Sequence, residues 1–404
     1  MAAVARSQPM RILVACDKFK ESLAGPAVNA AIAQALQHAL PNCIVSKMCM
    51  SDGGDGWIDS LRSPLQLEIQ QVQVKGPYGK PVTGQIGVCH SQRLAVIEMA
   101  AASGLELTTA AERNPLHAST FGLGQLIKAA CATDCSELLL GIGGSATNDG
   151  GIGALHALGL QVELRDRATP EQITGRDLQH IQRLSLPGCD WAEMQSMSVA
   201  ARAARARQVL LGRSDRVVRV ACDVTNPFTG PQGATAVFSA QKGATAAQQV
   251  ELEAGMVNLT KHLELLTGVS VEVMPGAGAA GGVGGGFAAV LGAELQRGVV
   301  LLSRTLGLER AIADADLIVT GEGSYDAQTF SGKVVSHVKD LGRQYNKPVV
   351  VVCGVSKVPE VSNEAVLQLT SQFPLDACMH DTAQCLEGLI KRNSGLFERL
   401  LGRS

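Results

Sequence analysis

Short aliphatic runs recur along the chain, each ending in a cluster of glycine and acidic residues, and this pattern constrains the fold most. Such clusters end the runs that begin near residues 11, 137, 216 and 317. In a parallel sheet covered by helices, strands are buried on both faces and read as unbroken aliphatic runs. Ligands bind at the carboxyl ends of such strands. The pattern predicts an α/β protein whose functional residues gather at that edge.

The expected elements change character along the chain. A strand at 11–17, a helix at 27–40 and a strand at 44–50 open it, and Pro41 closes the helix. Alternating stretches at 71–74, 82–88 and 94–99 then indicate antiparallel hairpins. The remaining expectations are a helix at 121–133, a helix or loop excursion at 190–215, and strands at 137–141, 216–222, 269–274, 317–320 and 349–354.

A chain of 404 residues exceeds what one hydrophobic core usually serves, so two domains are expected. The units after Asp314 resemble those at the amino terminus more than those in between. We therefore predict a discontinuous α/β domain of residues 10–70 plus 300–404, with a mainly parallel, doubly wound sheet. An inserted central α/β domain would span residues 71–299.

Composition favours a globular protein with a small-molecule partner. Hydrophobic residues make up 46% and charged residues 18%, which argues against disorder. The net charge is −2 with no basic run, so neither nucleic acid nor a membrane surface is an expected partner. Residues 273–293 form the longest charge-free apolar stretch, but glycines and Pro275 make a membrane span unexpected. A cytoplasmic location is expected, with an organelle and a homodimer left open.

The eleven cysteines lie mostly in apolar stretches and are expected to be reduced core thiols. Cys131 and Cys135 lack a second pair of ligands at zinc-like spacing, so no structural metal is expected. The amino terminus has no apolar segment typical of a secretory signal.

Several of the candidate residues could serve either a binding site or the local structure alone. The loop at 143–145 (GGS) is either a nest of backbone N–H groups for phosphate or a tight turn that requires glycine. Asn148 and Asp149 either belong to the site or cap the next helix. Asp17 is either a turn residue or a site residue, and the charges of Lys18 and Lys20 behind it favour the site.

Two nucleotide-binding motifs are unsupported. Gly276, Gly278 and Gly281 match the dinucleotide fingerprint, but the acid expected about twenty residues on, Glu294, falls in an apparent helix. The Walker spacing also fails, because Ala327 stands where that motif has its first glycine before Gly332 and Lys333.

Taken together, the motifs resemble those of the type 1 glycerate kinases. The resemblance runs from about Arg11 to past Lys333 and is carried by DKFKESL, SDGGDG, EMAAASGL, RNPLHASTF, GIGGSATNDGG, the motif at 223–230, QKGA, PGAGAAGG and GEGSYDAQ. It implies ATP-dependent phosphorylation of glycerate, for the most part to 2-phosphoglycerate. It also implies two α/β domains, one shared between the chain ends, with the active site in the cleft between them.

The chain departs from the family pattern in a few places. Asp55 stands where Glu is more usual, Lys18 where Ser is common, and Val334-Val335 where a Pro is often near. The excursion at 190–215 is long, and the tail after Val355 is a weak match. These departures bear on substrate preference more than on the reaction class.

Phosphoryl transfer needs charge neutralisation and a carboxylate near the attacking hydroxyl. We expect Asp17 or Asp223 to orient that hydroxyl, and Arg113 and His117 to bind the glycerate carboxylate unless they form a helix entry. The predicted catalytic residues are Asp17, Lys20, Asp223, Asp326 and Lys333; the residues for ATP and its phosphates are Gly143, Gly144, Ser145, Asn148, Asp149, Lys242, Gly276, Gly278 and Gly281; the substrate residues are Ser22, Arg113, His117, Asn226 and Gln328; and the Mg²⁺ ligands are Glu322 and Asp326.

Two other functions remain open from the sequence. A kinase for another sugar acid or hydroxy acid would keep the phosphate motifs and change only the pocket for the acid. A non-catalytic ATP-binding protein would be expected to lose the metal-binding carboxylates, and Asp17, Asp223, Glu322 and Asp326 are all present. If the strands before Asp17 and Asp326 share one parallel sheet, both carboxylates open onto one crevice.

Overall fold

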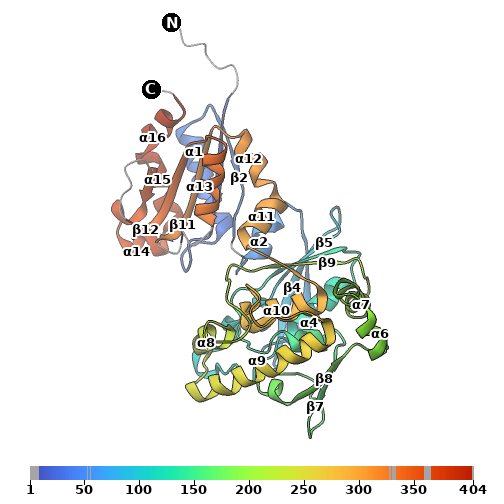
Figure 1. Ribbon diagram of the computed structural model, residues 1–404. Helices are drawn as coiled ribbons and strands as arrows, with labels where there is room; N and C mark the ends of the chain where they lie inside the picture. The colour runs from blue at the N-terminus through green and yellow to red at the C-terminus, as the bar shows by residue number, and fades with distance from the viewer. Residues whose placement is uncertain are drawn as a thin grey trace. The chain divides into compact units, whose positions relative to one another are not determined.

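The protein is described by a computed structural model that covers residues 9–51, 53–54, 56–326, 329, 334–358 and 365–402. The chain divides into two compact units, whose elements are labelled in Figure 1. Unit 1 consists of Met1–Asp52, Asp59–Leu65 and Val299–Ser404, and unit 2 of Gly53–Ile58 and Gln66–Gly298. Two helices, α2 (Trp57–Arg62) and α11 (Gly298–Leu306), contain residues of both units.

Unit 1 is built on a five-stranded sheet in the order β13-β12-β11-β1-β2, and every neighbouring pair is parallel. Strands from the two ends of the chain therefore lie side by side. The strands are β1 (Met10–Cys16), β2 (Cys43–Lys47), β11 (Leu317–Tyr325), β12 (Val349–Ser356) and β13 (Ala365–Gln368). The helices are α1 (Gly25–Ala39), α12 (Leu308–Asp314), α13 (Val334–Gln344), the 3-10 helix η6 (Leu369–Ser371), α14 (Leu375–His380), α15 (Thr382–Arg392) and α16 (Ser394–Leu400).

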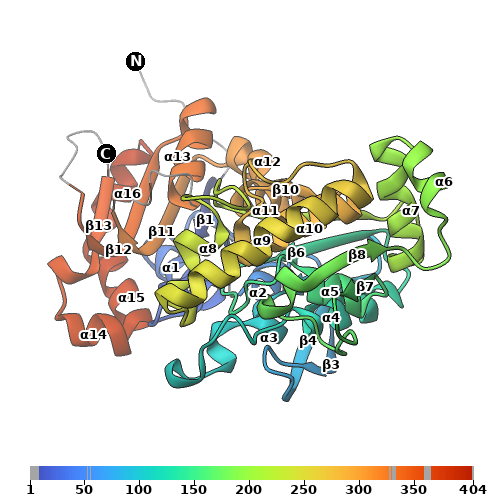
Figure 2. The same cartoon turned by 60° about the horizontal axis from the view of Figure 1, so that its bottom comes forward.

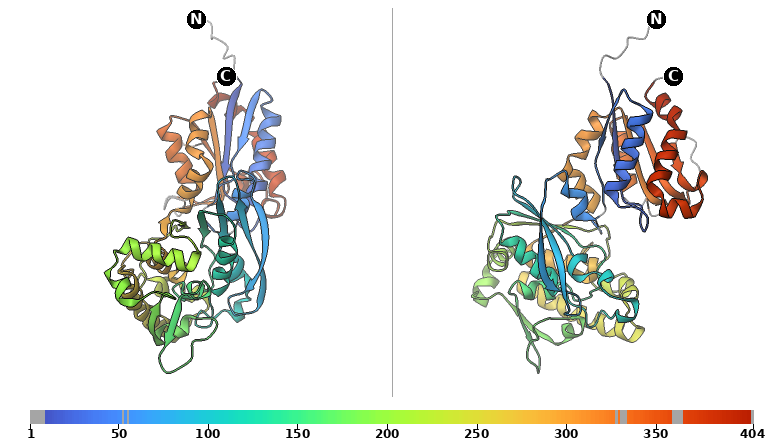
Figure 3. Two further views of the ribbon diagram at one scale, coloured as in Figure 1. Left: turned by 90° about the vertical axis from the view of Figure 1, so that its right-hand side faces the viewer. Right: turned by 180° about the vertical axis from the view of Figure 1, so that it is seen from behind.

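Helices cover both faces of this sheet. Residues Ile12 to Cys16 of β1 are all buried, and since successive side chains point to opposite faces, both faces need cover. Ile12, Val14 and Leu317 share one core with residues of α1, α15 and α16. Helices α12 and α13 contact β1 from the opposite face (left panel of Figure 3). Unit 1 is thus a doubly wound parallel sheet formed by both chain ends, and the predicted fold class is confirmed.

Unit 2 has a mixed six-stranded sheet in the order β10-β9-β6-β5-β4-β3 and a small antiparallel pair, β7 with β8. The pairs β3-β4 and β4-β5 are antiparallel, as the alternating pattern predicts, and the pairs from β5 to β10 are parallel. The strands are β3 (Glu68–Lys75), β4 (Pro81–Cys89), β5 (Leu94–Glu98), β6 (Glu137–Gly141), β7 (Gln161–Leu164), β8 (Ile181–Ser185), β9 (Val217–Ala221) and β10 (Glu294–Gln296).

The helices of unit 2 enclose one aliphatic core. Figure 2 shows the long helix α9 running beside α10, and these two helices are in contact. The helices are α3 (Ala100–Ser103), η1 (Leu105–Leu107), η2 (Ala110–Glu112), α4 (Phe121–Cys131), α5 (Ile152–Ala157), η3 (Gly175–His180), α6 (Trp191–Ser196), α7 (Val199–Leu211), α8 (Ala234–Phe238), η4 (Ala240–Lys242), α9 (Ala246–Thr267) and α10 (Ala279–Leu291).

Two local predictions are wrong. The stretch 269–274 alternates like a strand, but it is a turn-rich connection after the left-handed Gly268 that ends α9. Glu294 does not lie in a helix, because α10 ends at Leu291 and Glu294 opens the edge strand β10. Alternation alone does not make a strand, since a strand also needs a partner edge. The segment that begins at Glu294 has such an edge, because β10 pairs with β9. Among the described residues, none of the helices has both the length and the hydropathy to cross a membrane.

Candidate functional site

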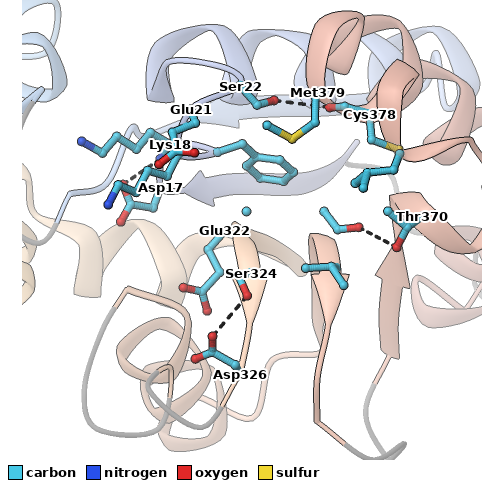
Figure 4. Close-up of a pocket in the computed structure, with 16 residues that line it drawn as sticks. Asp17, Lys18, Glu21, Ser22, Glu322, Ser324, Asp326, Thr370, Cys378 and Met379 are labelled. Carbon is cyan, nitrogen blue, oxygen red and sulfur yellow. Dashed lines mark hydrogen bonds between the residues drawn. The ribbon is translucent and has the colours of Figure 1, made fainter.

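A pocket of about 450 Å³ lies in unit 1 at the carboxyl ends of β1, β11 and β12. Asp17 and Lys20 enter it from the loop after β1, and Glu322 and Asp326 from the end of β11. In Figure 4 the carboxylates of Asp17, Glu322 and Asp326 occupy the left part of the view. With Ser22, which also lines the pocket, the structure therefore brings together five of the predicted site residues, from two segments about three hundred positions apart in the sequence.

The loop after β1 is held by its backbone. The Asp17 amide donates to the carbonyl of Gly321 at 2.9 Å, which continues the parallel ladder beyond the strand. Its carboxylate Oδ1 accepts from the Lys18 amide at 2.6 Å. Buried Asn29 of α1 bonds both the amide and the carbonyl of Cys16. These contacts fix the backbone of Cys16, and the position of Cys16 in turn orients the side chain of Asp17.

Two thiols lie beside Asp17. Burial raises the pKa of Cys49 to about 11, and the nearby Asp17 carboxylate adds to the shift. Burial likewise raises the pKa of Cys16. Both cysteines are therefore protonated thiols near neutral pH and not nucleophiles.

Glu322 and Asp326 are tied together by short-range hydroxyl contacts. The Thr329 hydroxyl donates to Glu322 Oε1 at 2.5 Å, and the Ser324 hydroxyl donates to Asp326 Oδ2 at 3.1 Å. The Asp326 amide in turn donates to Thr329 Oγ1 at 3.1 Å. These hydroxyl and amide contacts orient the two carboxylates at the end of β11.

Ser22 was expected to bind substrate, but its hydroxyl has partners within the protein. Ser22 Oγ lies 2.5 Å from Thr382 Oγ1 and 3.3 Å from the carbonyl of Cys378. The Thr382 hydroxyl donates to the Cys378 carbonyl at 2.7 Å. Ser22 therefore ties the loop after β1 to helices α14 and α15, and this anchor explains its place in the motif. That it also binds substrate stays a prediction.

Sequence reasoning missed one wall of the pocket. Val355, Thr370, Leu375, Cys378 and Met379 line it, and all except Val355 lie in the tail where the family resemblance weakens. Nothing in the local sequence marks these residues as site residues, because isolated apolar side chains in short helices are common on protein surfaces.

In unit 2, Asp149 is fully buried and acts as an internal connector. Its Oδ2 accepts from the Thr120 amide at 2.8 Å and the Thr120 hydroxyl at 2.7 Å, and its Oδ1 from the Gly151 amide at 3.1 Å. Burial raises the pKa of Asp149, and these hydrogen bonds oppose the shift. Asn148 is also buried, and its amide donates to the Thr235 hydroxyl at 3.2 Å. Their proposed contact with ATP stays a prediction.

Lys242 is buried too, at 2% exposure. Its ammonium donates to Ser145 Oγ at 2.8 Å and to the Thr147 carbonyl at 2.7 Å. Burial lowers the pKa of Lys242 to about 7, and the nearby Asp149 carboxylate opposes this change. Lys242 thus holds the loop that contains Ser145. Its expected role as a phosphate cation is untested.

The glycines at 276, 278 and 281 pack closely against neighbouring parts of unit 2. A Cβ on Gly278 would lie 2.2 Å from the Pro227 carbonyl, and one on Gly281 would lie 2.1 Å from the Thr147 carbonyl. The Gly278 amide already donates to the Asn226 carbonyl at 3.0 Å. Gly276 is buried against the Cys222 thiol, where a Cβ would lie 3.1 Å from the sulfur. Close backbone packing accounts for these glycines without a bound nucleotide.

The loop at 143–145 is more open. Gly144 is exposed with a φ of 69°, a value that favours glycine. The Gly143 amide donates to the Gly53 carbonyl at 3.4 Å, and the Gly144 carbonyl accepts from Leu105 at 2.9 Å. The tight-turn reading therefore has direct support, and the phosphate nest stays a prediction.

The remaining predicted residues of unit 2 are not among those that line the pocket of unit 1. Arg113 is half-buried, and its Nε is buried without a hydrogen-bond partner; His117 is exposed. Asp223 is exposed, with Oδ1 accepting from the Gly298 amide at 3.0 Å, and the Asn226 side chain donates to the Gln232 carbonyl at 2.8 Å. Gln328 and Lys333 lie outside the described residues.

Carboxylates and lysines at the carboxyl edge of a doubly wound parallel sheet are typical of enzymes that bind nucleotides or phosphorylated small molecules. The sequence matches the family model described as the glycerate kinase family over residues 12–397. It is 39% identical to a glycerate kinase of Bacillus subtilis (strain 168) and 37% identical to the glycerate 2-kinase of Escherichia coli (strain K12). Each match covers 85% of this chain and 85% of the relative.

A solved structure is similar over nearly the whole chain. It is the crystal structure of a protein from Salmonella typhimurium LT2 provisionally named glycerate kinase 2, with a TM-score of 0.82 and 34% sequence identity. The similarity covers 97% of this chain and 99% of that one. The chain belongs to the glycerate kinase family, and the resemblance and the prediction of a kinase enzyme are confirmed.

Proposed function

We propose that this chain transfers the γ-phosphoryl group of ATP to a hydroxyl of D-glycerate, giving 2-phosphoglycerate and ADP. The observation that supports this most directly is the pocket of unit 1, where Asp17, Lys20, Glu322 and Asp326 line one cavity. Phosphoryl transfer is mostly positioning and charge stabilisation, and this set supplies both.

In the proposed reaction, a bond forms between the glycerate oxygen and the γ-phosphorus while the bond from that phosphorus to the β,γ-bridging oxygen breaks. In this proposal the Asp17 carboxylate accepts the hydroxyl proton. The contacts to Lys18 and Gly321 fix the loop that carries it. Lys20, on the exposed part of the loop, offsets negative charge on the phosphate oxygens.

The donor set fits Mg²⁺, which proteins usually hold by one or two carboxylates together with substrate phosphates. Glu322 and Asp326 would hold the ion, and they are oriented by Thr329 and Ser324. Among the described residues no group of three or more potential metal ligands is preassembled, and in this proposal the ATP phosphates supply the remaining ligands. When bound, the ion would neutralise charge on the phosphate oxygens.

The test is turnover of D-glycerate with ATP and Mg²⁺, followed by phosphorus NMR of the product. We expect ADP and 2-phosphoglycerate, and loss of activity with EDTA. A panel of other hydroxy acids and sugar acids provides the comparison. Turnover of one of these in place of glycerate would reassign the substrate, and absence of any turnover with intact ATP binding would favour a binding protein.

A further inference from the structure

The pocket of unit 1 has an apolar half that the proposed catalytic roles do not use. Val355 at the end of β12 and Leu375 and Met379 on α14 line it. Leu375 is 64% exposed and Met379 is 37% exposed. The two residues stand four positions apart, so they lie on one face of the helix. Large apolar side chains exposed in a pocket indicate a ligand with an apolar surface.

Hydroxyl groups near this wall are already engaged. Thr370 Oγ1 donates to the Gly354 carbonyl at 3.1 Å, and Ser22 is bound to Thr382 and Cys378. A small hydroxy acid placed here would lose its hydrogen bonds to water and find few replacements, which is costly. The apolar half is therefore a poor site for glycerate.

The size of the pocket also exceeds what a small hydroxy acid needs. Its volume of about 450 Å³ lies within the range of roughly 300–1,000 Å³ that is usual for larger organic ligands. The other half is charged, with Asp17, Lys18 and Lys20 from the loop after β1 and Glu322 from β11. Figure 4 shows Thr370 and Cys378 on the right and Lys18 and Glu322 on the left. A ligand with an apolar ring and an anionic tail matches this division.

We propose that the apolar half binds the adenosine part of ATP, with the base packed against Leu375 and Met379. The phosphates then extend toward Lys18 and Lys20, and toward the carboxylates through their bound cation. This assignment rests on the proposed function, which supplies ATP as the ligand, and it locates the nucleoside in unit 1. Doubly wound sheets bind ligands at this edge, and the pocket lies there.

The test compares three probes in the full-length protein by calorimetry: adenosine, Mg-ADP, and inorganic triphosphate with Mg²⁺. The variant L375Q/M379Q replaces the apolar surface with neutral polar groups. We expect affinity for adenosine and Mg-ADP to fall about tenfold or more, and affinity for inorganic triphosphate to stay the same. The matched control is Ile44→Gln, since Ile44 is 50% exposed in unit 1 but does not line the pocket. Met379→Leu, which keeps the apolar surface, should bind Mg-ADP like the wild type.

Each outcome decides one question. Unchanged Mg-ADP affinity in L375Q/M379Q, or weaker affinity for all three probes alike, would overturn the adenosine assignment. A rise in KM for glycerate alone would assign the apolar half to the acid. If the wild type binds Mg-ADP and L375Q/M379Q does not, but no glycerate is phosphorylated, the adenosine site stands and the proposed function fails.

Discussion

At the scale of single residues, two of the carboxylates that line the pocket, Asp17 and Asp326, come from strands that are neighbours in space. Asp17 follows β1 and Asp326 follows β11, and these strands pair in register from Ile12 with Leu317 to Cys16 with Gly321. If both carboxylates serve one reaction, removing either should cost about a hundredfold or more in kcat.

The first prediction is therefore that Asp17→Asn combined with Asp326→Asn is barely slower than the slower single variant, because groups that act as a unit are strongly non-additive. Steady-state kinetics of the four proteins measure this, with circular dichroism to check folding. A loss in the double variant equal to the product of the two single losses would show that the residues act independently.

Lys242 carries a second residue-scale prediction, on pH. Because its pKa is lowered to about 7, the folded state binds this proton less tightly than the unfolded state. Below pH 7 the wild type bears the full cost of a buried charge. This cost disappears as the pH rises from 7 toward the ordinary lysine value of 10.5.

We compare the free energy of unfolding of Lys242→Met with that of the wild type. The difference should favour the variant most below pH 7 and should shrink steadily toward pH 10. Unfolding in urea, monitored by tryptophan emission, measures the difference, since Trp57 and Trp191 both belong to unit 2. A difference that stays constant over this range would mean that Lys242 keeps its ordinary pKa.

These residues also mark how far sequence alone could reach. That Asp17, Glu322 and Asp326 share one edge of the sheet could be predicted, because polar residues after aliphatic runs mark strand ends, and the strand ends of one parallel sheet meet at one edge. Asp149 and Lys242 belong to the same kind of cluster, yet they are buried and bonded internally. Whether a loop residue is buried depends on the segments that pack over the loop. These segments, such as η4, are distant in sequence, so the local pattern does not predict the burial.

At the scale of elements, the loop after β1 depends on helix α15 for its position. Thr382 begins that helix, is buried, and meets Ser22 at 2.5 Å. Removing one hydroxyl leaves the other without this hydrogen-bond partner, which lowers the free energy of unfolding. Removing both hydroxyls leaves no unpaired group of this kind.

We predict that Ser22→Ala and Thr382→Val are non-additive, with a coupling energy of about 0.5–3 kcal/mol in the free energy of unfolding. Denaturant unfolding monitored by circular dichroism gives the cycle. Thr382→Ser, which keeps the hydroxyl, is the control and should stay close to the wild type. Strictly additive losses would show that the short contact contributes nothing.

Elements differ in how well the sequence predicts them. The buried strands β1, β11 and β12 follow directly from aliphatic runs, and β3 to β5 from alternation. Helix α14 has only six residues and no strong periodicity, so its place in the pocket wall could not be predicted. Its position is fixed by contacts with α15 and η6, which are tertiary.

At the scale of the whole molecule, each unit contains strands from both halves of the sequence. In unit 1, β1 and β2 precede residue 188 and β11 to β13 follow it. In unit 2, β6 precedes residue 188 and pairs with β9, which follows it. Gly188 itself is exposed, with a φ of 68°, in the connection between β8 and α6.

A protein cut at an engineered protease site between Pro187 and Gly188 should therefore remain assembled. We expect one gel-filtration peak at the position of the uncut protein and two bands on a denaturing gel, because both cores hold the fragments together. Separation of the fragments under native conditions would show that these pairings are weaker than the cores imply.

The pairing of β1 with β11 has a consequence for synthesis on the ribosome. The Thr320 hydroxyl bonds the Ala15 carbonyl, and these residues are 305 positions apart. At about 5–20 residues per second, roughly 15–60 s pass between the emergence of the two strands. During that interval β1, whose apolar side chains lie on both faces, has only β2 as a partner, while all of unit 2 is being made. Until β11 emerges, this unpaired strand edge leaves the nascent chain open to pairing with other chains.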